Sequence, residues 1–148
     1  CYIPLQGGDA AFQRGIPTSR RSSGLAVWMG LRAHGFGAVR DAVRRNIELT
    51  RLIETLLGER GFEIIPDGEL SVACARWAEG SLDAEACDLL QERIAAEVVA
   101  GGEAWFSSMQ HDGRKWLRFN MVNLHTREHH VRHLVQIVTQ TARRLAGC

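Results

Sequence analysis

The dipeptide Asp112-Gly113 constrains the fold more than any other feature, because Asp-Gly between two apolar runs is a strong signal for a tight β-hairpin. The flanking runs, 104–109 and 115–122, have the length and apolar content of short strands. A second pair of candidate strands, 62–65 and 70–77, is separated by a Pro-Asp-Gly turn. The sequence therefore predicts two hairpins.

Segments with helical periodicity flank and separate these hairpins. The first is capped by a serine at 22–23 and should end at Gly35; it is apolar nearly all the way round, which predicts that most of its surface is covered. A long amphipathic helix follows over 38–57. Two more helices are predicted to begin at the caps Ser81 and Thr126.

This order of elements predicts an α+β fold. Hairpins joined by helices favour a two-layer sandwich, with a mainly antiparallel four-stranded sheet and helices on one face. Residues 22–148 are predicted to form one domain with its leading helix, since the 148-residue chain has the length of an ordinary domain. Residues 1–21 carry turn formers and little periodicity, so they are predicted to form an arm or loop.

Composition and charge argue against several classes of function. The net charge is +1, and the basic residues of 38–57 alternate with acids, so we expect a solvated helix face and no nucleic-acid partner. No run is long enough to span a membrane, and we expect no secretory leader because no charged and then apolar stretch stands at residues 1–21. The cysteines lie far apart, which favours reduced thiols in a cytoplasmic protein. They are Cys1, Cys74, Cys87 and Cys148.

Two groups of polar residues suggest chemistry. Four histidines crowd the start of the last predicted helix, where a spacing of four residues would suit a metal ion, although we favour a solvated polar face. They are His125, His129, His130 and His133. Arg118 lies between Leu117 and Phe119 in a predicted strand, where a charge is costly unless it is paired. Its partner would be an internal acid, which the residues alone favour, or the carboxylate of a substrate.

Three stretches of the sequence occur in an order that is found in one known family. Residues 16–32 carry Ile-Pro-Thr-Ser-Arg-Arg and then Val-Trp-Met-Gly-Leu-Arg, and residues 70–77 read Leu-Ser-Val-Ala-Cys-Ala-Arg-Trp. The third stretch is Leu-Arg-Phe at 117–119, followed by Asn123 and Thr126. In this order they resemble the C-terminal third of the group II pyridoxal-phosphate-dependent amino-acid decarboxylases.

The resemblance implies that the whole protein is a homodimeric lyase of fold type I, which converts a small-molecule L-amino acid to its amine and carbon dioxide. The cofactor, pyridoxal 5'-phosphate, would be bound upstream of residue 1, so this part would be inactive alone and would belong to a small C-terminal domain. Arg118 matches an arginine near the active site that meets the substrate carboxylate in some members. Arg20 and Arg21 match arginines whose role is expected to be structural. Lys115 is interpreted as a turn lysine, not as the cofactor lysine.

One departure from the family pattern bears on the product. The family's mobile loop carries a catalytic tyrosine shortly before the Ile-Pro at 16–17, whereas residues 8–15 contain none and Tyr2 lies too early. The sequence therefore leaves open whether the product is an amine or an aldehyde, and which amino acid is used. The alternatives are a non-catalytic α+β interaction or oligomerisation module and a small metal-binding protein.

Overall fold

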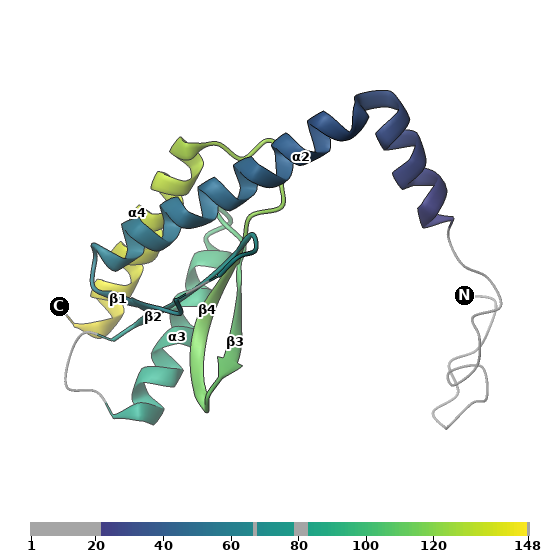
Figure 1. Ribbon diagram of the computed structural model, residues 1–148. Coiled ribbons are helices and arrows are strands. Elements are labelled where there is room, and N and C mark those ends of the chain that lie inside the picture. Colours follow the sequence, from purple (N-terminus) through teal and green to yellow (C-terminus); the bar gives the residue numbers. More distant parts are fainter. Residues whose placement is uncertain (1–21, 67, 79–82, 148) are drawn as a thin grey trace, which may run out of the picture. The chain divides into compact units, whose positions relative to one another are not determined.

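The computed structural model describes residues 22–66, 68–78 and 83–147 (Figure 1). The chain divides into two compact units, residues 1–39 and residues 40–148. The predicted arm, residues 1–21, lies outside the described residues, so a domain boundary after residue 21 stays a prediction.

The described part of the first unit is the beginning of helix α2 (Ser23–Gly58), which continues into the second unit. The backbone leaves the helical conformation at Gly35, with φ 78° and ψ 162°, which glycine adopts without a side-chain clash. The break predicted there is confirmed, although the two predicted helices form one element across it. Four large apolar side chains of this stretch are between 53% and 62% exposed: Leu25, Val27, Trp28 and Met29.

We expect the 148-residue chain to self-associate through this apolar stretch, because contact between two copies removes the exposed side chains from water. Sedimentation velocity should show a dimer or a larger species, and Trp28→Glu combined with Met29→Glu should shift it to a monomer. Leu89→Glu is the matched control, since Leu89 of the second unit is 54% exposed and should not affect the size. A wild-type monomer at high concentration would contradict the expectation.

The second unit contains the rest of α2 and all the remaining described elements. They are β1 (Phe62–Ile64), β2 (Val72–Trp77), α3 (Ala84–Ala100), β3 (Ser107–His111), β4 (Arg114–Asn120) and α4 (Glu128–Ala146). The strands form one antiparallel sheet in the order β1-β2-β4-β3, shown in Figure 1. The predicted α+β fold with a four-stranded antiparallel sheet is confirmed.

One face of this sheet shares its core with three helices. Ile53 of α2, Ile94 of α3 and Val135 of α4 are fully buried in a cluster that also contains Leu117 and Phe119 of β4. Because the apolar stripes of all three helices meet the same sheet face, they pack as one layer against it. This is the predicted two-layer arrangement, and none of the described helices packs on the other face of the sheet.

The predicted hairpin turn is confirmed, whereas its strands are shifted. Asp112 and Gly113 have φ values of 49° and 72°, and positive φ at both central residues is what a type I′ turn requires. Strand β3 begins at Ser107 instead of residue 104, and β4 ends at Asn120 instead of residue 122. Exposed apolar residues such as Trp105, which is 78% exposed, had made both strands look longer.

The caps predicted for the last two helices are wrong. Asp83, not Ser81, precedes α3, and its carboxylate accepts a hydrogen bond of 2.7 Å from the backbone N–H of Ala86. Helix α4 begins one residue later than a Thr126 cap implies, with Arg127 at the N-cap. The backbone N–H of Arg127 donates to Nδ1 of His130 at 3.1 Å, so the third residue of the helix reaches back to the N-cap, as in a capping box.

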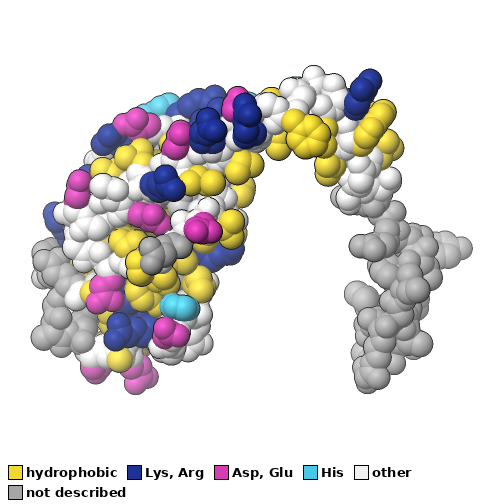
Figure 2. All heavy atoms as spheres, viewed as in Figure 1, with side chains coloured by type: hydrophobic (Ala, Val, Ile, Leu, Met, Phe, Trp, Pro, Cys, Tyr) yellow, Lys and Arg dark blue, Asp and Glu magenta, His cyan; other side chains and the backbone are white. Residues whose placement is uncertain are grey.

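The charged side chains of α2 agree with the predicted solvated face. Figure 2 shows basic side chains along this helix with acidic ones between them, and Arg40 and Asp41 form an ion pair of 3.5 Å. Among the described residues, no helix combines the length and apolar character that crossing a bilayer requires.

Candidate functional site

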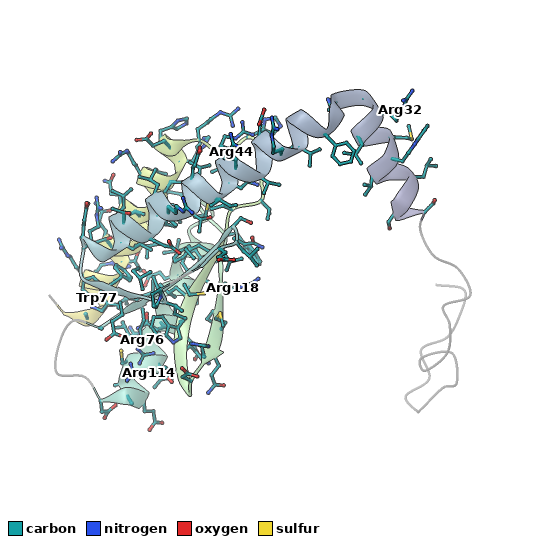
Figure 3. All side chains as sticks on the ribbon, in the orientation of Figure 1. Arg32, Arg44, Arg76, Trp77, Arg114 and Arg118 are labelled. Atoms are coloured by element: carbon teal, nitrogen blue, oxygen red, sulfur yellow. The ribbon has the colours of Figure 1, made fainter. Side chains whose placement is uncertain are left out.

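Arg118 projects from the sheet face opposite the helices. Side chains alternate along a strand, and the flanking Leu117 and Phe119 are buried in the core, so Arg118 lies on the open face. The register pairs it with Cys74 of β2 and Ser107 of β3. Because β4 has a neighbour on each side, Arg118 lies in the interior of the sheet, where Figure 3 labels it.

The guanidinium of Arg118 forms no ion pair with any residue that the structure describes. Its electrostatic neighbour is the Cys74 thiol: burial raises the pKa of Cys74, the Arg118 charge lowers it, and Glu54 raises it. Arg118 is half-buried, so its charge is only partly hydrated. A half-buried guanidinium without a carboxylate is able to bind one that arrives from outside. This geometry does not support the internal ion pair that the residues alone favoured.

The surroundings of Arg118 on the open face are apolar and polarizable. Trp116 is 8% exposed, and its Nε1 is buried without a hydrogen-bond partner among the described residues. Met109 is opposite Trp116 in the register, and its Sδ accepts a 3.5 Å contact from the Cys74 thiol. An indole and two sulfurs beside a guanidinium suit a ligand that has both an aromatic part and a carboxylate.

Lys115 does not fit the cofactor that the family resemblance implies. It is the single lysine of the sequence, and its Nζ forms an ion pair with Glu92 of α3. The residues before it make the tight Asp112-Gly113 hairpin, which is no phosphate-binding loop leading into a helix. Lys115 therefore lacks the surroundings that a cofactor-binding lysine needs.

We expect this chain alone to form no covalent adduct with pyridoxal phosphate, because the Lys115 amine is held by Glu92 and lacks a phosphate site. Borohydride reduction followed by peptide mass spectrometry checks this. A protein that is known to hold pyridoxal phosphate on a lysine is the positive control and should give the reduced adduct under the same conditions. A stoichiometric pyridoxyl group on Lys115 would contradict the interpretation that this lysine does not bind the cofactor.

An ion pair that the sequence did not predict lies on β2, beside the site. Arg76 is 4% exposed, and its Nη1 donates to Oδ1 of Asp88 and to the backbone carbonyl of Lys115, both at 2.5 Å. The same Asp88 oxygen accepts the backbone N–H of Lys115 at 2.9 Å. The only sequence signal for this ion pair was Arg76 itself, a charged residue in an apolar strand. Nothing in the sequence marked Asp88 of α3 as its partner.

The four histidines do not gather around a common point. His129 and His130 approach each other, with Nε2 atoms 3.1 Å apart, while His133 contacts Glu103 at 3.0 Å. Within the described ranges, no three potential metal ligands lie close enough to hold an ion. The metal hypothesis therefore gains no support from this structure.

The fold is that of the C-terminal domain of pyridoxal-phosphate-dependent decarboxylases. The crystal structure of *Oryza sativa* TDC with PLP and tryptamine matches with a TM-score of 0.77 over 85% of this chain and 28% of that one, at 24% identity. No family model matches the sequence.

Sequence relatives support the same resemblance. Tyrosine decarboxylase 2 of *Arabidopsis thaliana* is 29% identical over 128 residues, which are 86% of this chain and 24% of that protein. Phenylacetaldehyde synthase of the same plant is 26% identical over 128 residues, 86% of this chain and 26% of its own length. The resemblance to the group II decarboxylases is confirmed, and the chain spans about a quarter of the length of these relatives.

Proposed function

We propose that the chain is the C-terminal part of a pyridoxal-phosphate-dependent decarboxylase that converts an aromatic L-amino acid to its amine and carbon dioxide. The observation that carries the proposal is Arg118, a half-buried guanidinium without an ion-pair partner among the described residues, on the open face of a sheet whose fold such enzymes share. Bound elsewhere in the whole protein, the cofactor supplies the electron sink that decarboxylation needs.

The contribution of this chain is to hold the substrate. The planar guanidinium of Arg118 offers parallel N–H donors that match the two oxygens of a carboxylate, so it fixes the orientation of that group as well as its position. The half-buried Met109 offers an apolar contact for an aromatic side chain, with the buried Trp116 opposite it in the register. This combination supports aromatic amino acids over acidic ones, which would bring a second carboxylate to the same apolar surface.

The experiment is a decarboxylation assay on the full-length protein with added pyridoxal phosphate. Carbon dioxide released from carboxyl-labelled tyrosine, tryptophan and glutamate should be highest for the aromatic substrates. Absence of release from every amino acid, in a protein that binds the cofactor, would favour the non-catalytic interaction module. We further propose a homodimer in the cytoplasm, which gel filtration and cell fractionation of the full-length protein test.

A second candidate product follows from two observations. Residues 8–15 contain no tyrosine where the resembled family has its catalytic one, and one relative is named phenylacetaldehyde synthase. Both suit a reaction that ends in an aldehyde instead of an amine, in which dioxygen is the oxidant and ammonia and hydrogen peroxide are released with the carbon dioxide. Measuring amine and aldehyde in the same reaction mixture decides between them, since each molecule of released carbon dioxide must be matched by one of the two.

A further inference from the structure

The ladder between β2 and β4 stops three residues short of the hairpin end of β4. Its last backbone pair on that side is Ala75 with Leu117, and beyond it the backbone of Lys115 has no partner on β2 in the register. Both polar groups of Lys115 are satisfied by side chains instead: its N–H donates to Asp88 and its carbonyl accepts from Arg76. The Arg76–Asp88 pair thus replaces one rung of the sheet.

This clamp joins three elements at one point. Arg76 comes from β2, Asp88 from α3 and Lys115 from β4. Arg76 is almost fully buried, so its charge requires the carboxylate, and the pKa of Asp88 is lowered chiefly by the Lys115 backbone N–H, with Arg76 contributing. A charge-assisted hydrogen bond is stronger and more directional than a neutral backbone rung, so the clamp fixes the position of β4 against both neighbours.

Arg118 lies on β4, three residues after Lys115, and its side chain is on the same face of the sheet as that of Arg76. The Cys74–Arg118 pair directly follows the Ala75–Leu117 pair in the register, so any shift of β4 at Lys115 is transmitted to Arg118 within two rungs. Figure 3 labels both arginines on this part of the sheet. We infer that Arg76 and Asp88 are positioning residues, which set the place of the Arg118 guanidinium; the inference rests on the proposed function.

A purely structural pair would stabilise the domain without affecting how substrate binds. A positioning pair also affects the Michaelis constant, because a guanidinium displaced by a fraction of an ångström loses one of its two hydrogen bonds to the carboxylate. Variants of the pair should lose stability in either role. Their KM, measured on folded protein, should rise only if the pair positions Arg118.

The test measures KM, kcat and melting temperature in the full-length protein for Arg76→Met, Arg76→Lys and Asp88→Asn. We expect KM to rise roughly fivefold in Arg76→Met with kcat nearly unchanged, and less in Arg76→Lys, which keeps a cation. Asp88→Asn is the milder variant if Arg76→Met fails to fold. Arg132→Met is the matched control, since it removes an exposed arginine paired with Glu128 and should leave KM unchanged.

Arg118→Ala, measured alongside, separates the two proposals. A higher KM in Arg118→Ala with wild-type KM in the clamp variants, at a lowered melting temperature, overturns the positioning role and leaves the proposed function standing. Wild-type kinetics in Arg118→Ala overturn both. Hydrogen exchange gives an independent readout: the amides of Lys115 and Leu117 should exchange faster in Asp88→Asn, and protection equal to wild type would also contradict the clamp.

Discussion

Replacing Asp88 with alanine is expected to lower the free energy of unfolding of this chain by about 3 kcal/mol, because it strands a buried charge. The side chain of Arg76 is 5% exposed, and Asp88 is its ion-pair partner. Without the carboxylate, the Arg76 guanidinium either stays without an ion-pair partner in the protein interior or is hydrated by water that enters there. The backbone N–H of Lys115 loses its acceptor in the same step.

Urea unfolding followed by circular dichroism measures this loss. Glu97→Ala is the matched control on the same helix: Glu97 pairs with Arg144, but both side chains are more than 40% exposed, so we expect a change below about 1 kcal/mol. Equal losses in the two variants would show that the Arg76–Asp88 pair is no stronger than a surface one.

The dependence on pH identifies the charge as the cause. The pKa of Asp88 is lowered in the folded state, so its carboxylate stabilises the fold above the unfolded pKa of about 3.9 and loses this effect as the pH falls further. The stability difference between wild type and Asp88→Asn should therefore be constant near neutral pH and shrink below about pH 4.

Local signals in the sequence predicted the helices and strands well. Contacts between residues far apart in the sequence could not be predicted from it. The Asp112-Gly113 turn was predictable because a type I′ turn demands residues that tolerate positive φ, and the break at Gly35 for a similar reason. The cap of α3 was misplaced because serine and aspartate are both good caps and the sequence offers both within three residues. Which of them caps is decided by where the helix packs.

The candidate site shows the same division. Arg76 and Arg118 have the same sequence signature, a charge in an apolar strand, and the sequence alone does not distinguish them. In the structure Arg76 holds the internal carboxylate that was expected for Arg118, while Arg118 has none among the described residues. The difference depends on α3, which brings Asp88 to the end of the ladder next to Arg76, whereas no described acid pairs with Arg118.

Arg118→Ala in the full-length protein is expected to reduce kcat/KM by tenfold or more, about 1.4 kcal/mol, while the melting temperature stays close to wild type. The reason is the absence of an internal partner within the part that the structure describes: its removal strands no buried carboxylate, so the loss falls on substrate binding instead of on folding. Arg118→Lys should recover little, because an ammonium is a point charge and cannot contact both oxygens of a carboxylate in one plane.

Arg114→Ala is the matched control, since Arg114 lies four residues before Arg118 on the same strand and face. Its side chain is exposed, and its ion pair with Glu63 is a solvent-exposed contact of 3.6 Å, which contributes little to stability. Its loss should therefore change neither activity nor stability appreciably. Specific activity and melting temperature, measured on the same preparation, separate the two possible roles of Arg118. Unchanged specific activity in Arg118→Ala would remove Arg118 from the site, and with it the residue on which the proposed substrate contact of this chain depends.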